Sequence, residues 1–188
     1  MQRKAAVFFD RDDTLIEDIP YLGDPSRVKL MPECREALRA LQAAGFELFI
    51  ATNQSGVGRG LITREQVAAV NAEMLRQIGD MAFREIYCCY DDPNNPRDNC
   101  RKPSPAMLLQ GRDEYGLELE RSYMVGDRLR DVQAGRNAGC KSIYYCRVRH
   151  ESDAAQAAAL ADFTSDSLAD IARWIVRDAA EPASHGTR

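Results

Sequence analysis

Short apolar runs alternate with longer amphipathic segments along this chain of 188 residues, and that alternation limits its fold more than any other feature. The apolar runs have the length of buried strands and comprise residues 5–9, 47–52, 85–89, 122–125 and 141–146. The amphipathic segments show helical spacing and comprise residues 32–44, 63–81, 105–115, 129–138 and 167–176. Such a regular succession of strand and helix predicts repeated βαβ units.

The predicted fold is therefore α/β, a doubly wound, Rossmann-like parallel sheet with helices on both faces, because right-handed crossovers carry the helices to either side. The sequence holds no stretch long enough for a large cap domain. We expect residues 1–180 to form one domain and residues 181–188 a flexible tail. Residues 17–30 are candidates for a small flap, and residues 90–99 for a loop. Ligands of such folds bind beyond the carboxyl ends of the strands.

The net charge and the composition limit the kinds of partner that this protein can bind. The chain has 25 Lys and Arg against 29 Asp and Glu, which gives a net charge of −4. This charge argues against a protein that binds nucleic acid or anionic membranes nonspecifically. No apolar run has the length of a membrane span, and the first residues lack a secretory signal, so we expect a cytoplasmic protein. We also expect a monomer. In that compartment the cysteines are expected to be thiols or metal ligands. They are Cys34, Cys88, Cys89, Cys100, Cys140 and Cys146.

The first apolar run ends in a cluster of acids, Asp10-Arg11-Asp12-Asp13. Asp10 and Asp12 lie two residues apart at the end of a buried strand, where like charges repel unless a cation neutralises them. This spacing indicates a site for a divalent metal. The alternative is a solvated acidic turn in which Asp13 caps the following segment.

The second run ends in Thr52 and Asn53, followed by a loop with several glycines. A hydroxyl, an amide and exposed backbone N–H groups at the edge of a sheet are suited to phosphate. Arg59 is flanked by glycines in this loop and can reach an anion. A plain helix cap by Thr52 and an exposed Arg59 are the alternatives.

Two further strand ends carry charged residues. Arg101 and Lys102 place two adjacent cations at a turn before Pro103. The alternative to a functional role is a solvated basic turn. Asp127 and Asp131 lie four residues apart at the start of a helix, where one can be an N-cap and the other a surface ion-pair partner. Together, however, the four strand ends supply a nucleophile with metal ligands, a hydroxyl, a cation and another acid, which is the composition of a phosphoryl-transfer site.

In this order the motifs resemble those of the haloacid dehalogenase superfamily of phosphatases, DxDx[TV], a strand-terminal Thr or Ser, a Lys, and GDxxxD. The resemblance implies that Asp10 is the nucleophile that forms an aspartyl phosphate, and Asp12 the general acid and base. It implies Mg²⁺ held by the carboxylates of Asp10 and Asp127 and the backbone carbonyl of Asp12, with Asp131 as support. Thr52 and Lys102 would hold the phosphoryl oxygens. These residues are Asp10, Asp12, Thr52, Lys102, Asp127 and Asp131.

The segments DRD, TNQSGxxRG and CRKP are similar to the capless branch of this superfamily that hydrolyses heptose 1,7-bisphosphate or histidinol phosphate. That similarity implies a small phosphorylated substrate, with a sugar bisphosphate favoured. It implies substrate contacts from Asn53, Arg59, Arg101 and Arg128, since guanidinium groups suit phosphate and sugar oxygens. Two alternatives stay open, another small-molecule or nucleic-acid 3′-phosphatase, and a non-hydrolytic Mg²⁺-binding phospho-acceptor or scaffold domain.

The chain departs from the branch at two places. Asp13 replaces the usual glycine. The branch carries a zinc loop with Cys-x-His and Cys-x-Cys pairs, whereas here the corresponding residues are Cys89, Asp91, Asp98 and Cys100. Carboxylates are poorer ligands than thiolate or imidazole for a closed structural zinc site. We therefore expect a loop without Zn²⁺, held by prolines and by hydrogen bonds from its aspartates.

Overall fold

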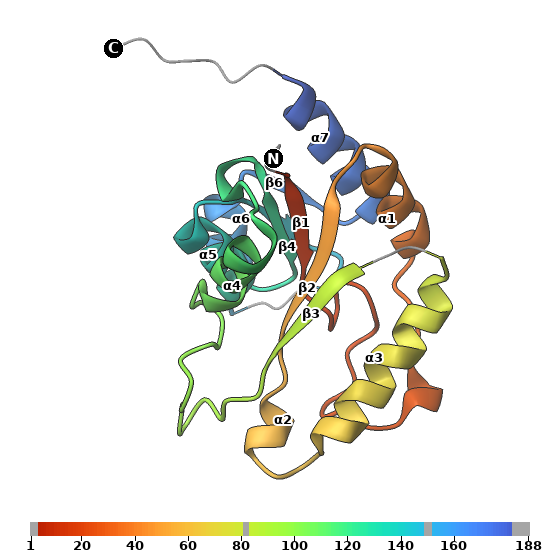
Figure 1. The fold of residues 1–188 in the computed structure, drawn as a ribbon, viewed down its shortest axis with the longest axis vertical. Helices are drawn as coiled ribbons and strands as arrows, with labels where there is room; N and C mark the ends of the chain where they lie inside the picture. Colours follow the sequence, from red (N-terminus) through yellow and green to blue (C-terminus); the bar gives the residue numbers. More distant parts are fainter. Residues whose placement is uncertain (1–3, 81–82, 149–151, 182–188) are drawn as a thin grey trace.

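The computed structural model describes residues 4–80, 83–148 and 152–181. Within them, six strands form one parallel sheet in the order β3-β2-β1-β4-β5-β6, which confirms the predicted doubly wound topology (Figure 1). The strands are β1 Ala6–Phe9, β2 Glu47–Asn53, β3 Phe83–Cys89, β4 Tyr123–Gly126, β5 Lys141–Tyr145 and β6 Phe163–Ser165. The order reverses beside β1, so the crevice where such folds bind ligands lies at the end of β1.

The α-helices lie between the strands in sequence, except α7, which follows β6. They are α1 Cys34–Ala43, α2 Ser55–Gly58, α3 Arg64–Ile78, α4 Ala106–Tyr115, α5 Leu129–Ala138, α6 Ala154–Leu160 and α7 Leu168–Ala180. A capping box starts α3, with the Thr63 side chain accepting from Gln66 N and the Gln66 side chain accepting from Thr63 N. Helix α5 ends at Gly139, whose φ of 84° is a conformation that glycine adopts without strain.

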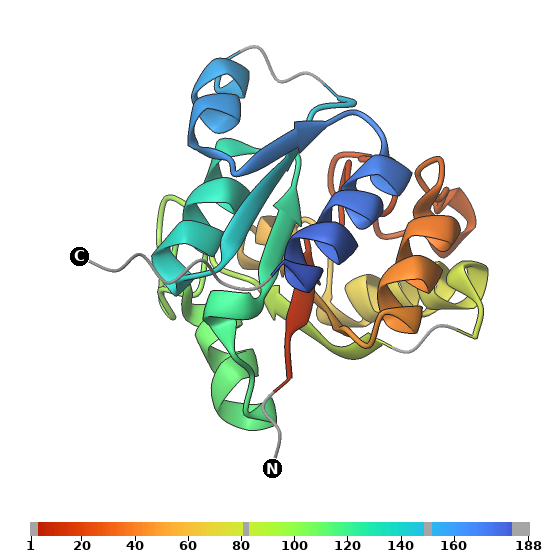
Figure 2. The ribbon, with the colours of Figure 1, turned by 90° about the horizontal axis from the view of Figure 1, so that it is seen from above.

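The helices cover both faces of the sheet (Figure 2). Alternate residues of β1 point to opposite sides, so Val7 and Phe9 join the hydrophobic core under α1, α3 and α7, whereas Ala6 and Phe8 join the core under α4. Phe8 stacks on Phe49 of β2 with 5.0 Å between ring centroids. Both faces of the central strand are therefore buried, which fixes the position of the acids that follow it.

Three features differ from or add to the sequence prediction. The runs predicted five strands, and β6 with helix α6 was missed; β6 is a three-residue strand at the sheet edge with half-buried and exposed residues. Residues 17–30 contain a short 3-10 helix, Pro25–Arg27, and their Leu22 and Val28 pack into the core. The predicted tail falls on residues 182–188, outside the described part of the chain, except Glu181. Among the described helices none is long and apolar enough to cross a membrane.

Candidate active site

The predicted catalytic residues converge at the carboxyl edge of the sheet, toward the bottom of Figure 1. Asp10 follows β1 and its N–H donates to Val125 O of β4 at 2.9 Å, which places it over the centre of the sheet. Thr52 ends β2, and Asp127 follows β4. All three are buried. Parallel strands thus bring together residues that lie more than a hundred positions apart.

Lys102 links two of the acids. Its ammonium Nζ lies 2.7 Å from Asp10 Oδ1 and 2.7 Å from Asp131 Oδ1, and its side chain is fully buried. The contact to Asp10 is a hydrogen bond. Burial by itself lowers the pKa of Lys102, but the carboxylates of Asp10 and Asp131 outweigh it, and the pKa is raised. The lysine is therefore charged and offsets part of the negative charge of the site.

Two of the buried acids have raised pKa values. Burial, and after it the neighbouring acids, raises the pKa of Asp127; burial and Asp10 likewise raise that of Asp131, against the opposing effect of Lys102. Asp10, Asp127 and Asp131 each offer an oxygen, and these oxygens lie within 4.8 Å of one another. Hard carboxylate oxygens at this spacing fit Mg²⁺, which the predicted ligands Asp10 and Asp127 would hold. Asp131 contacts Lys102 Nζ and accepts a hydrogen bond from Arg128 N at 2.9 Å. Its predicted support of the metal would therefore be indirect.

A glycine allows this close approach. At Gly126, the last residue of β4, an added Cβ would lie 2.3 Å from Asp131 Cβ and 2.6 Å from one of its carboxylate oxygens. A larger residue would therefore push Asp131 away from Lys102. The glycine of the GDxxxD motif thus has a packing reason that is independent of its own backbone angles.

Asp12 lies at the wall of the same cavity, which has a volume of about 170 Å³ and is lined by Asp10, Asp12, Asn53, Asp127 and Arg128 among others. The side chain of Asp12 is 21% exposed, in contrast to its buried neighbours. A carboxylate that borders the cavity without being enclosed is suited to exchange a proton with a ligand.

The predicted substrate-binding residues divide into two groups. Asn53 and Arg128 line the cavity. Arg59 stands at the rim, where its Nη1 donates to Tyr21 Oη at 2.7 Å and its Nε lies 3.4 Å from Asp92 Oδ1. Arg101 has a buried Nη1 without a hydrogen-bond partner among the described residues, and burial followed by the charges of Arg130 and Arg59 lowers its pKa. Such an unsatisfied cationic donor suits an anionic ligand.

Sequence analysis missed three polar residues of the site. Arg11 and Gln54 both donate to the Asp12 carboxylate, and Arg130 lines the cavity with a buried Nε that has no partner in the described part of the chain. Arg130 belongs to the motif GDRLRD, so its two-residue spacing from Arg128 was a usable signal. Arg11 and Gln54 gave no such signal, because their contacts depend on the folded positions of β1 and β2.

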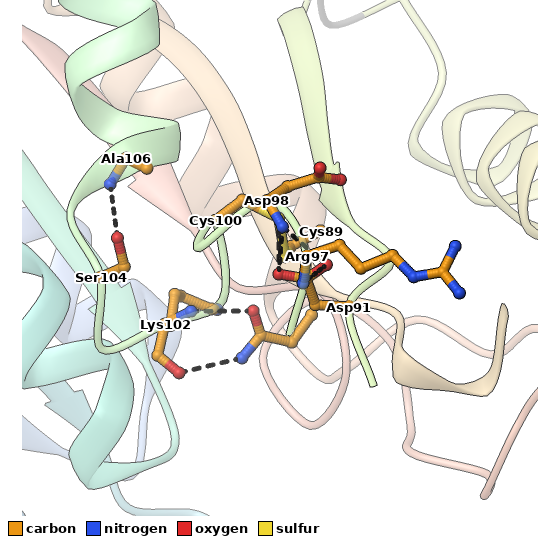
Figure 3. The surroundings of a disulfide bond; sticks show 9 residues. Cys89, Asp91, Arg97, Asp98, Cys100, Lys102, Ser104 and Ala106 are labelled. Carbon is orange, nitrogen blue, oxygen red and sulfur yellow. Dashed lines mark hydrogen bonds between the residues drawn. A yellow bond between two sulfur atoms is a disulfide. The ribbon is translucent and has the colours of Figure 1, made fainter. Parts of the chain in front are cut away.

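The loop after β3 corrects one prediction. Cys89 and Cys100 form a disulfide, with 5.5 Å between their Cα atoms, so the expectation that every cysteine is a thiol or a metal ligand is wrong for this pair (Figure 3). The physical reason is that the loop returns Cys100 to the end of β3, within the distance a disulfide needs. Within the described part of the chain, no disulfide includes Cys34, Cys88, Cys140 or Cys146.

The four residues considered for zinc are not all brought together. A sulfur of Cys89, a sulfur of Cys100 and an oxygen of Asp91 lie within 4.8 Å of one another, whereas Asp98 takes part through its backbone, its N–H donating to Asp91 at 3.2 Å. The Arg97 N–H donates to the same carboxylate at 3.1 Å (Figure 3). The loop is thus held by hydrogen bonds to an aspartate, as predicted, with Asp91 as the acceptor. Two sulfurs joined to each other are not the thiolates that zinc requires.

Comparison with known proteins agrees with this geometry. Residues 21–139 match the family model described as haloacid dehalogenase-like hydrolase. A relative from Yersinia pestis is 34% identical over 182 residues, covering 93% of this chain and 96% of its own length. The chain therefore belongs to the haloacid dehalogenase-like hydrolase family.

Two of the similar proteins carry the same name. The Yersinia pestis protein is called D-glycero-beta-D-manno-heptose-1,7-bisphosphate 7-phosphatase, as is one from Mesorhizobium japonicum, 37% identical over 145 residues, or 71% of this chain and 65% of that protein. The chain thus spans just under two thirds of the Mesorhizobium relative. The crystal structure of D,D-heptose 1,7-bisphosphate phosphatase from B. bronchiseptica, complexed with magnesium and phosphate, superposes with a TM-score of 0.83 at 28% identity, covering 93% of this chain and 99% of that one.

Proposed function

We propose that this hydrolase is a Mg²⁺-dependent phosphomonoesterase that removes the 7-phosphate of D-glycero-D-manno-heptose 1,7-bisphosphate through an aspartyl-phosphate intermediate. The observation that carries the proposal is the contact of Lys102 Nζ with both Asp10 and Asp131 at 2.7 Å, beside the buried Asp127. The relatives of that name, which align over most of both chains, support the choice of substrate.

Asp10 performs the first step. Lys102 holds Asp10 Oδ1, which leaves the other carboxylate oxygen to attack the phosphorus in line. A bond forms between that oxygen and phosphorus while the bond from phosphorus to the sugar oxygen breaks. Asp12 gives its proton to the departing alkoxide, which is a poor leaving group without one. The product of this step is the sugar alcohol and a phosphorylated Asp10.

Asp12 also serves the second step. As a carboxylate it takes a proton from a water molecule, and the water oxygen attacks the phosphorus of phosphorylated Asp10. The bond between phosphorus and the Asp10 oxygen breaks, which releases inorganic phosphate and restores the nucleophile. The carboxylates of Asp10 and Asp127 and the backbone carbonyl of Asp12 would hold Mg²⁺, which would supply charge neutralisation for the phosphoryl group and the acids.

The cations of the site explain a preference for a doubly anionic substrate. In the proposal Lys102 and Thr52 hold the transferred phosphoryl oxygens. Arg128 lines the cavity, Arg59 donates to the cavity-lining Tyr21, and Arg101 has a buried donor without a partner among the described residues. An arginine with an unpartnered buried donor gains a charge-assisted hydrogen bond when a second phosphate or a sugar oxygen reaches it. One phosphate at the catalytic acids and a second at the arginines fits a sugar bisphosphate.

The test is release of inorganic phosphate from heptose 1,7-bisphosphate, fructose 1,6-bisphosphate and histidinol phosphate, each with and without Mg²⁺. We expect turnover of the heptose ester to exceed that of the others by about 100-fold, since a missing or misplaced charged contact costs about that much. Preference for histidinol phosphate would reject the sugar substrate and keep the mechanism. Stable labelling of Asp10 without phosphate release would instead establish a non-hydrolytic phospho-acceptor.

A further inference from the structure

Arg11 is one of the largest fully buried side chains of the molecule, 1% exposed, although it stands between two acids in the sequence. A guanidinium group keeps its charge in proteins, so its burial is unfavourable unless carboxylates and hydrogen bonds compensate it. The environment of Arg11 therefore has to supply those partners.

The guanidinium of Arg11 grips the carboxylate of Asp12. Its Nε donates to Asp12 Oδ1 at 3.1 Å, and its Nη2 donates to Oδ1 at 2.9 Å and to Oδ2 at 3.2 Å. The third nitrogen, Nη1, donates to Asn71 Oδ1 of helix α3 at 2.8 Å. Asn71 is itself buried and lies 60 residues further along the chain. The side chain of Arg11 is thus anchored on a helix and holds both oxygens of Asp12.

Gln54 completes the support from the other side. Its Nε2 donates to Asp12 Oδ2 at 2.7 Å and to Thr52 Oγ1 at 2.9 Å. Asp12 consequently contacts groups fixed by β2 and by α3, while its own side chain still borders the cavity. Fixed partners of this kind hold a catalytic group within a fraction of an ångström of its working position.

We propose that Arg11, oriented by Asn71, is a positioning residue that holds the Asp12 carboxyl group in place for proton transfer to the leaving group. Arg11 is among the residues that line the cavity, but its side chain is only 1% exposed and its Nε and Nη2 donate to Asp12, so it acts through Asp12. The inference rests on the proposed phosphatase function. A lysine at this position keeps the charge but loses the planar fork that contacts both oxygens, so it would restore only part of the effect.

The experiment compares two esters that differ in their need for an acid, heptose 1,7-bisphosphate with an alkoxide leaving group and p-nitrophenyl phosphate with a stable one. The value of kcat/KM reports the step in which the leaving group departs. We expect Arg11→Met to lower kcat/KM about 100-fold for the heptose ester and less than about 5-fold for the aryl ester, since general acid catalysis is worth at least about 100-fold. Arg11→Lys should fall between.

Asn71→Ala leaves Arg11 and Asp12 in place and removes only the orienting amide, so it tests the inference if Arg11→Met does not fold. We expect about a 10-fold loss for the heptose ester, again with the aryl ester nearly unaffected. The matched control is Arg84→Met, which removes another arginine–carboxylate pair, that with Glu47, at the opposite edge of the sheet. It should change neither value.

The outcomes separate the two claims. Equal losses for both esters, or no loss in either Asn71→Ala or Arg11→Lys, would overturn the positioning role while the wild type remains an active phosphatase. A wild type that hydrolyses neither ester with Mg²⁺ would overturn the proposed function and this inference with it.

Discussion

The two edges of the parallel sheet treat charge in opposite ways. At the carboxyl edge three acids crowd together, and burial raises the pKa of Asp127 and Asp131. At the amino edge Glu47, the first residue of β2, pairs with Arg84 and Lys4, and the hydrogen bond from Arg84, with a smaller one from Lys4, lowers its pKa to about 2. One edge concentrates like charge and the other neutralises it. Buried acids crowded in this way are typical of a functional site whose ligand supplies a further cation.

The largest effect that distinguishes the edges is loss of activity. Asp10→Asn removes the nucleophile and should lower kcat about 10⁴-fold or more, as loss of a catalytic nucleophile does. Phosphate release with saturating heptose 1,7-bisphosphate measures it. Glu47→Gln at the amino edge is the control and should keep wild-type kcat. Comparable activity in Asp10→Asn would contradict the assignment of the nucleophile.

Removal of the buried cation comes next. Lys102→Met has a similar shape but leaves Asp10 and Asp131 facing each other without compensation. We expect the free energy of unfolding to fall by about 3–5 kcal/mol, the usual cost of leaving a buried charge without its partner. Urea denaturation at pH 7.5 measures this. Activity should fall as well, by about 10³-fold, because the cation contacts the reacting group.

Asp127→Asn should have the opposite effect on stability. Because the pKa of Asp127 is raised in the folded state, its contribution to stability is present below the unfolded pKa, 3.8, and is lost as pH rises. An asparagine does not ionise. The metal-free variant should therefore be more stable than the metal-free wild type by about 1–2 kcal/mol at pH 8, with a smaller gain at pH 5. Denaturation in EDTA at both pH values tests this, and a gain that shrinks as pH rises would contradict it. Added Mg²⁺ should stabilise the wild type more than the variant.

The smallest effect lies at the amino edge. The lowered pKa of Glu47 means that its ion pairs stabilise the fold above the unfolded pKa, 4.5, and that this contribution is lost as pH falls toward about 2. Both cations are about half exposed, so Glu47→Gln should cost only about 1 kcal/mol at pH 7. The difference in unfolding free energy should shrink between pH 5 and pH 3. A constant difference would show that charge is not its origin.

Regular elements were predictable because they follow local patterns. The range 129–138 coincides with α5, and the run at 47–52 lies within one residue of β2. Strand β6 has three residues and α6 seven, lengths at which periodicity is not defined. The convergence of Asp10, Thr52 and Asp127 was also predictable, since strand ends in a parallel sheet meet at one edge.

The supporting contacts of the site were not predictable in the same way. In the sequence Arg11 is simply a charged residue between acids, which favours exposure, and its burial depends on Asn71 of a distant helix. The disulfide depends on where an irregular loop brings Cys100 back to β3. Both are pairings across the fold, and local spacing carries no information about them.

Asn53 has a consequence for altering this enzyme. Its side-chain Oδ1 accepts from Lys102 N at 3.0 Å, and its Nδ2 donates to Lys102 O at 3.3 Å. One amide side chain therefore fixes the backbone of Lys102 to the end of β2 through one accepted and one donated hydrogen bond. The loop around Arg59 can therefore be rebuilt to redirect the protein to other esters. The two hydrogen bonds of Asn53 would meanwhile keep Lys102, and with it the reaction chemistry, in place.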